Sequence, residues 1–453
     1  IGGKFEFEAI DFQFFHRPRV EIRRGSFSIP GEAEGTFETL IVYPRVLPLL
    51  TGHVDISFIE IVKPVIRLAI PEAAEPEAVE EERNTIALIK NYISSALGYF
   101  NEGDRGLEAV IKNGILVLVQ PGYEDMTFDG LNVSAELPDD RLEIKVTGQG
   151  SLWKRLSLSA SASTSAKDIY GSLAVEGLKP HLLSRYFPEA LRIIKDSNVN
   201  LAVDFSSEKL DSLSLKVNAS IPGLTLSRNG EEFTARLKSL DAEARFADGK
   251  STVVLNRVEL TNPPAVISGS YEMEKSPASG KLHLEGTNVD AGAAREATLV
   301  AAGGNDVVDK IFEVVRGGSV PKVTLDAAGP TFREFWRKDN FTLKGSMVNG
   351  RIHIPVVEYD IEDASGDALI GNDILQGTNL SGRLGSSIGY DGTLVLGFDG
   401  DDAPLSLDIA VDAEPSEIPP VISRFVDDET VKHELSLLSN VKGKVTGRLK
   451  LGD

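Results

Sequence analysis

The 453-residue chain combines a hydrophobic content of 42% with a formal net charge of −21, from 68 acidic and 47 basic residues. The hydrophobic content is enough to bury a core, which argues against wholesale disorder, while the acidic balance argues against binding to nucleic-acid phosphates and against adhesion to a membrane through surface charge. The absence of cysteine excludes a thiol nucleophile, a disulfide framework and a thiolate metal site, and it fits an oxidising compartment such as the periplasm.

Residues 1–71 read as a β segment with one short helical turn. Alternating apolar and polar residues predict strands over 17–30, 35–44 and 54–64, and the stretch VLPLL at 46–50 predicts a turn of helix between the last two.

The same segment holds the one notable basic cluster of the sequence. Two interpretations stay open: the cations contact lipid headgroups beside a membrane anchor, or they are outward-facing charges on a strand that also carries Glu21. The candidate membrane-proximal residues are Arg17, Arg19, Arg23 and Arg24.

Residues 72–103 interrupt the alternation. A run rich in proline and glutamate comes first, which we read as a solvated linker. An apolar stripe then predicts an amphipathic helix over 84–100, which would close the mouth of a groove or fill it. The stripe consists of Ile86, Ile89, Ile93, Leu97 and Phe100.

Period-2 alternation dominates the rest of the chain and predicts antiparallel strands joined by hairpins. Two β segments, 104–290 and 341–453, flank a helical interruption at 291–340. The interruption reads as two helices over 291–315, broken at the Gly303–Gly304 pair, followed by a short helix at 331–337. Further helices are expected at 180–195 and 417–425. The alternating phrases lie at 131–137, 142–146, 156–160, 213–219 and 405–412.

One-sided alternation gives each strand an apolar face and a polar face. In a compact sandwich or a closed barrel, other side chains fill the space over the apolar face. In an open, curled sheet the same face lines a trough. The alternation leaves these architectures open.

The sequence carries no catalytic or cofactor signature, so we predict a protein that is not an enzyme and needs no cofactor or metal. The six histidines show no i, i+4 pair and no ligand spacing. Residues 385–389 (GSSIG) match the G-x-S-x-G pattern, but Tyr390-Asp391-Gly392 and another strand follow, which predicts a hairpin rather than a nucleophile elbow. A serine hydrolase using Ser387 is a remote alternative.

Residues 35–52 (GTFETLIVYPRVLPLLTG), followed by a strand that ends at Pro64, resemble the amino-terminal signature of the bacterial AsmA-like family. The carboxy-terminal third resembles the long members of the YhdP type. The segments that carry this second resemblance are 311–321, 344–355, 363–367, 418–421 and 441–447.

The resemblance implies a fold similar to that of the bridge-like, chorein-type lipid transfer proteins, a long taco-shaped sheet with an apolar interior. Members of the family are anchored in the inner membrane of diderm bacteria, reach across the periplasm and are implicated in carrying phospholipid to the outer membrane. No apolar run of spanning length is present, so we interpret the chain as a segment of a longer, anchored protein.

We therefore expect a mainly β fold, an elongated, curved (taco-shaped) antiparallel sheet with an apolar groove and a few short helices. The expected function is that of a periplasmic segment that carries phospholipid between inner and outer membrane, with phospholipid acyl chains, the inner membrane and an outer-membrane protein as partners. The alternative is a non-enzymatic scaffold with a filled core, acting in outer-membrane assembly. Alternation places these candidates in the groove: Leu156, Leu158, Leu213, Leu215, Val217, Leu394, Leu396, Phe398, Leu405, Leu407 and Ile409.

Overall fold

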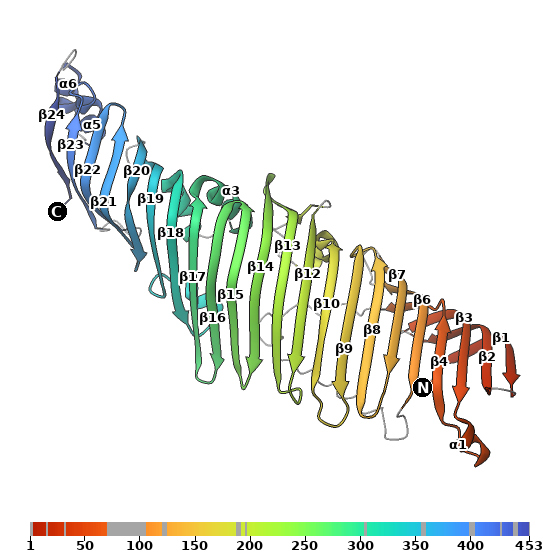
Figure 1. The fold of residues 1–453 in the computed structure, drawn as a ribbon. Helices are drawn as coiled ribbons and strands as arrows, with labels where there is room; N and C mark the ends of the chain where they lie inside the picture. Colours follow the sequence, from red (N-terminus) through yellow and green to blue (C-terminus); the bar gives the residue numbers. More distant parts are fainter. Residues whose placement is uncertain are drawn as a thin grey trace. The chain divides into compact units, whose positions relative to one another are not determined.

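The fold is mainly β, with antiparallel strands and a few short helices, as predicted (Figure 1). The chain divides into two compact units. Unit 1 comprises Ile1–Leu183, Ser197–Ser220 and Ala244–Asp248, and unit 2 comprises Ser184–Asp196, Ile221–Glu243 and Gly249–Asp453. The computed structural model describes residues 3–14, 17–30, 33–69, 106–119, 125–186, 192–194, 197–302, 306–354, 359–397, 404–425, 428–437 and 443–452. The helix expected at 84–100 lies outside these ranges.

In unit 1, the strands pair antiparallel, mostly with the strands next to them in the chain and otherwise with the next strand but one, apart from the exception below (Figure 1). A single-turn helix, α1 (Val46–Leu50), connects β3 to β4, as the VLPLL stretch predicts. The strands are β1 (Lys4–Gln13), β2 (Arg19–Ile29), β3 (Ala33–Pro44), β4 (Ile56–Val62), β5 (Val65–Ala69), β6 (Glu108–Val119), β7 (Met126–Glu136), β8 (Arg141–Gly150), β9 (Arg155–Ser163), β10 (Ile169–Leu178), β12 (Asn198–Ser207) and the first part of β13 (Ser212–Arg228).

The exception is a pair of parallel contacts, which the sequence did not predict. Both β4 and β5 run parallel to β6, with Ile61 beside Ile111 and Ile66 beside Leu116. A parallel neighbour needs a long connection that returns the chain to the same end of the sheet. In the sequence, residues 70–107 separate β5 from β6.

Unit 2 continues with antiparallel neighbours from β15 to β24. Its strands are β11 (Arg192–Ile193), most of β14 (Glu231–Ala247), β15 (Lys250–Asn262), β16 (Pro264–Lys275), β17 (Ala278–Asp290), β18 (Val315–Gly329), β19 (Phe341–Ile354), β20 (Tyr359–Gly371), β21 (Ile374–Leu384), β22 (Ser387–Gly397), β23 (Leu405–Ala413) and β24 (Val445–Leu451). Its helices are α3 (Ala291–Ala302), α4 (Asp306–Val314), the 3-10 helix η3 (Phe332–Trp336), α5 (Ile418–Phe425) and α6 (Glu429–Leu437).

The helix predictions for the last third are confirmed: α3 and α4 flank the Gly303–Gly304 pair, and η3 and α5 lie at 331–337 and 417–425. The helix predicted over 180–195 is wrong in its second half. The 3-10 helix η2 (Pro180–Tyr186) forms the first half, and Arg192 and Ile193 form the strand β11 against Ser227 and Leu226 of β13. At Arg192 and Ile193, backbone pairing with β13 replaced the helix that the apolar spacing predicted.

Several strands contain a residue in the left-handed backbone conformation at mid-length. The φ angle is +53° at Asn113, +51° at Asn349 and +53° at Asn379, and each residue lies within a register shift between neighbouring strands. Such a bulge inserts one residue and reverses the parity of the alternation beyond it. Asparagine tolerates this conformation better than a β-branched residue.

The clusters of fully buried residues are small. In unit 1, Leu137, Leu142 and Ala162 form one such cluster. In unit 2, Phe335 of η3 packs on Leu282 and Ala327. Elsewhere the apolar positions of the described strands are mostly half-buried, because each unit is a single layer of strands that contact their paired neighbours and a few short helices.

Candidate functional site

An unbroken row of apolar side chains crosses unit 1 from strand to strand. Directly paired residues lie on the same face of a sheet, so the register alone places the row on one face. None of its members is fully buried. The row consists of Ile10, Ile22, Leu40, Ile61, Ile111, Val133, Val146, Leu158, Leu173 and Val203, one each from β1, β2, β3, β4, β6, β7, β8, β9, β10 and β12.

A second row on this face lies beyond the bulges. Strand β8 alternates without interruption, so Gly148 and Gly150 share the face of Val146. Phe128 pairs with Gly150 and is buried. The row continues from Phe128 to Leu116, Ile66, Gly35 and Phe27.

The glycines in these rows make room for large neighbours. A Cβ on Gly148 would lie 2.5 Å from Leu131, and a Cβ on Gly35 would lie 2.5 Å from the ring of Phe27. Because glycine has no Cβ, the neighbouring Leu131 and Phe27 side chains can pack directly against the backbone of the sheet, and the apolar face stays continuous.

Unit 2 repeats the arrangement with two parallel rows. From β16 to β23, residues two apart on each strand belong to the two rows, so both lie on one face; on β15 a bulge separates Leu255 from Val258. Leu405 is 47% exposed, and most of the other members are half-buried. The first row is Leu255, Gly269, Leu284, Leu325, Leu343, Ile370, Leu375, Leu396 and Leu405; the second is Val258, Ile267, Gly286, Val323, Gly345, Ala368, Gly377, Leu394, Leu407 and Leu451.

Six of the eleven groove candidates lie in or beside these rows. Leu158 belongs to the row of unit 1, and Leu156 lies two residues away on the same face of β9, opposite Val175. The other four, Leu394, Leu396, Leu405 and Leu407, form two direct cross-strand pairs in unit 2.

The other five candidates are not members of these rows. Ile409 shares the face of Leu407 on β23, and its side chain lies over Gly389 and Gly392, where added Cβ atoms would come within 2.9 Å. Leu213, Leu215 and Val217 are half-buried on one face of β13, and Lys216 between them is exposed. Phe398 lies outside the described residues.

Alternation in the sequence missed much of the apolar face. It missed Ile111 and Leu116 of β6, which lie on the same face although their spacing is odd, because the bulge at Asn113 separates them. The apolar run at 115–119 hides which residues face which way. The Asn113–Gly114 pair directly before this run was the available signal.

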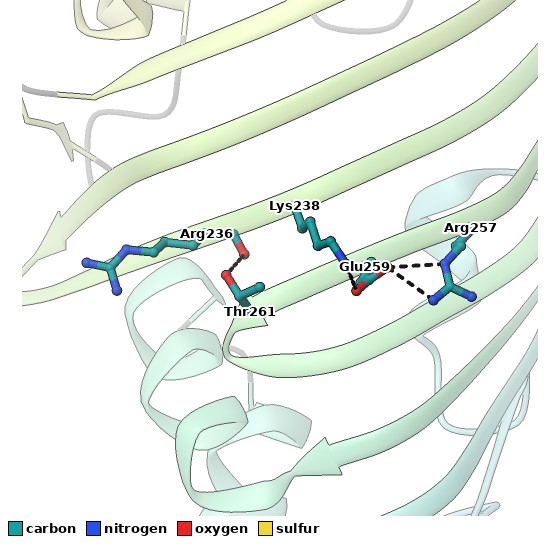
Figure 2. Close-up of polar contacts among 5 residues, drawn as sticks. All are labelled: Arg236, Lys238, Arg257, Glu259 and Thr261. Carbon is teal, nitrogen blue, oxygen red and sulfur yellow. Dashed lines mark hydrogen bonds and ion pairs between the residues drawn. The ribbon is translucent and has the colours of Figure 1, made fainter.

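The opposite face of the sheet is polar and carries cross-strand ion pairs. In Figure 2, Glu259 of β15 accepts hydrogen bonds from Lys238 at 2.8 Å and from Arg257 at 3.1 Å. These two cations lower the pKa of the Glu259 carboxyl. Thr261, on the same face of β15, donates to the backbone oxygen of Arg236 at 3.4 Å. Each pair is solvent-exposed and contributes little stability. The charges nevertheless show that this face of the sheet is in contact with water.

The helix η3 covers one end of the apolar face in unit 2. The ring of Phe335 has no exposed surface and lies against Gly280 and Gly329, while Tyr271 meets it edge-on at 6.1 Å. Thr331 caps the helix by accepting from the backbone N–H of Glu334. Here the face is filled by protein, as a sandwich core would be.

The arginine cluster at the amino terminus is paired with nearby groups. Arg23 contacts Glu21 at 2.8 Å and Asp11 at 3.3 Å, and Arg19 contacts Glu21 at 3.3 Å, all on the polar face. Glu21 and Asp11 raise the pKa of Arg23. Arg24 pairs with Glu8 at 2.7 Å, and the guanidinium of Arg17 lies 4.8 Å from the centre of the Tyr43 ring.

Ser387 lies in a hairpin, as predicted, but the turn is at Gly385–Ser386, and Tyr390-Asp391-Gly392 lies within β22. Leu384 pairs with Ser387, and strand β22 follows directly. The Ser387 hydroxyl donates to the Glu417 carboxylate and accepts from the backbone N–H of Glu414 at 3.1 Å. The hydrogen bonds from Ser387 and from the backbone N–H of Ser386 lower the pKa of the Glu417 carboxyl. Together with the Glu414 contact they fix the start of α5 to the hairpin.

Titratable groups do not gather into a metal site within the described part of the chain. His283 and His353 each contact one aspartate, Asp326 at 2.7 Å and Asp360 at 2.8 Å. No helix among the described residues is long and apolar enough to span a bilayer. No family model, curated protein or solved structure matches the chain.

Proposed function

We propose that the apolar face of each unit binds phospholipid acyl chains, and that the chain is a periplasmic segment of an AsmA-like, inner-membrane-anchored protein that carries phospholipid between the two membranes. The observation that supports this proposal is the cross-strand register, which joins apolar residues of ten consecutive pairing strands into one row on one face of unit 1.

The dimensions of the row suit a lipid. Nine spacings of about 4.8 Å give a length of roughly 43 Å across unit 1. One leaflet of a bilayer provides about 15 Å of hydrocarbon, half of a core of about 30 Å. The row is therefore longer than one extended acyl chain, and lipids could follow one another along it.

The energetics require such continuity. Exposing acyl chains to water costs about 0.8 kcal/mol per CH₂, or on the order of 25 kcal/mol for two sixteen-carbon chains. If a few polar residues interrupted the row, each lipid that moved past them would pay part of this free-energy cost. In unit 1 the row runs from Ile10 to Val203 without a polar residue.

Partial exposure of the row favours lipid binding over a filled core. In a sandwich, the opposing sheet covers the inner face and its side chains become inaccessible to water. Leu40, Val146 and Leu173, at the centre of their strands, all keep exposed surface. Within the described ranges no second layer covers this face, and an apolar face of this extent suits an apolar ligand.

The test is native mass spectrometry of the purified chain combined with lipid extraction. We expect phospholipid to co-purify in a defined stoichiometry and to be displaced by added phospholipid of a different mass. A folded chain without lipid that takes up none from vesicles would contradict the proposal and favour the non-enzymatic scaffold in outer-membrane assembly.

A further inference from the structure

A second apolar surface lies at one end of the strands of unit 1. It is formed by Phe12, Phe14, Leu47, Leu50 and Val54, called the α1 tip below. Their exposed fractions are 58%, 72%, 77%, 79% and 73%. The end of β1, the end of β3 and the start of β4 meet here, since Phe12 pairs with Val20, Val20 with Val42 and Val42 with Ile59 (Figure 1).

The turn that presents these side chains is internally fixed. The backbone N–H groups of Thr51 and His53 both donate to the Pro48 carbonyl, at 3.0 and 2.9 Å, and the Thr51 hydroxyl donates to it at 2.8 Å. Gly52 takes φ = +82°, and its N–H donates to Leu49 at 3.2 Å. The exposed leucines are thus held outward by a closed hydrogen-bonded turn.

The tip itself lacks acidic residues, although the chain is acidic overall. The protein has 68 acidic residues, yet segments 12–20 and 42–54 contain none and hold Arg17, Arg19 and Arg45; Asp11, Glu21 and Asp55 flank these segments, and Glu21 pairs with Arg19 at 3.3 Å. An apolar tip bordered by arginines complements the interface of a bilayer with anionic headgroups, where leucines enter the acyl region and cations meet phosphates.

The tip is also continuous with the lipid-binding face. Phe12 lies in a cross-strand row with Val20, Val42 and Ile59, directly beside the row that crosses the unit. Its ring stacks on that of Phe14 at 6.4 Å. A lipid that leaves a bilayer at the tip meets apolar surface at once.

We propose that the α1 tip inserts into the interface of a phospholipid bilayer and is the point where unit 1 exchanges lipid with a membrane. This inference rests on the proposed function, since it assigns a membrane-contact site to the same face. The acidic net charge of the chain argues against membrane binding through surface charge, but only the charge next to the tip acts on a membrane at this site.

The first experiment is flotation of the purified chain with vesicles of phosphatidylethanolamine and phosphatidylglycerol. The Leu47→Asp/Leu50→Asp variant is expected to bind these vesicles at least tenfold more weakly than the unaltered chain. The matched control is Val431→Asp/Leu437→Asp, at two exposed positions of α6, with exposed fractions of 40% and 61%. Equal binding by all three proteins would overturn the proposal, as would an equal loss in the control.

The second experiment does not depend on weakening the tip. The chain has no cysteine, so Leu50→Cys and Leu437→Cys each accept a single environment-sensitive fluorophore. On adding the vesicles, the probe at 50 is expected to shift to shorter wavelength and to be quenched by brominated lipid, while the probe at 437 does not change. An unchanged probe at 50 would mean that the tip contacts something other than a bilayer, such as a protein.

The two proposals fail separately. If the Leu47→Asp/Leu50→Asp variant still co-purifies with phospholipid but no longer binds vesicles, both hold. If it binds vesicles normally and still carries lipid, only the membrane-contact site is wrong. If the unaltered chain carries no lipid but its tip inserts, the lipid-binding face is wrong and a plain membrane-docking role remains.

Discussion

Replacing Leu158 by aspartate is expected to interrupt lipid binding in unit 1 without unfolding it. Leu158 lies between Val146 and Leu173 in the cross-strand row and is only half-buried. A charged carboxylate there would have to stay hydrated. It would therefore keep an acyl chain away from its own position and from those of its two neighbours.

The size of the effect follows from the strand spacing. Two spacings of about 4.8 Å remove roughly 10 Å of apolar contact. A leaflet of about 15 Å accommodates a sixteen-carbon chain, so some ten CH₂ groups are affected, at about 0.8 kcal/mol each. Even a quarter of the resulting total of about 8 kcal/mol would lower occupancy roughly thirty-fold.

The assay is photo-crosslinking of phospholipid from p-benzoylphenylalanine placed at Leu173, combined with lipid counts by native mass spectrometry. Leu158→Asp is expected to abolish the crosslink and to reduce the lipid bound per chain. Ser159→Asp is the matched control, because Ser159 is the next residue of β9 and faces the other way, between Lys145 and Ser172. It should leave both readings unchanged.

Circular dichroism and urea unfolding check the fold of each variant. If Leu158→Asp unfolds the unit, Leu158→Thr replaces it, since threonine is polar but suits a strand. Should either folded Leu158 variant crosslink lipid as well as Ser159→Asp, the apolar row is not the binding surface and the reasoning is refuted.

Three further outcomes concern stability. Phe335→Ala is expected to cost about 3–5 kcal/mol in urea unfolding, because the ring is fully buried; a cost under about 1 kcal/mol would contradict the packing. Asn113→Val, which puts a β-branched residue at φ = +53°, should cost roughly 1–3 kcal/mol, whereas Asn113→Gly should be near neutral by the same measurement. The pKa of Glu417 is lowered mainly by Ser387, so its contribution to stability is present above its ordinary value of 4.5 and is lost as the pH falls through the folded value. Ser387→Ala should therefore destabilise the protein more above this range than below it, and a pH-independent difference would exclude the linkage.

Much of the secondary structure followed from the sequence. Alternation located β8, β9 and β23, and the glycine pair at 303–304 separated α3 from α4. Local patterns suffice for such elements, because side-chain period and backbone-breaking residues act over a few positions. The helix α6 at Glu429–Leu437 was missed, and its apolar residues Val431 and Leu437 are exposed, so no buried stripe marked it.

The membership of the apolar face was predicted only in part. Leu158 and Leu407, which alternation selected, lie in the rows, whereas Ile61, Ile111 and Leu116 enter them through the parallel pairing with β6 and the bulge at Asn113. Both depend on which strands meet and in which register, which no short stretch of sequence specifies.

The sequence by itself determined that this protein is built of strands with one apolar and one polar side, because alternation in a strand fixes opposite directions for successive side chains. The tertiary structure alone decided that these sides join into continuous rows. After each bulge, the shifted register and the residue in the left-handed conformation return the apolar side chains to the same face. No second layer among the described residues covers Leu40, Val146 and Leu173, so these side chains stay partly exposed. Whether an apolar side becomes core or binding surface depends on what covers it, and that is a property of the packed chain.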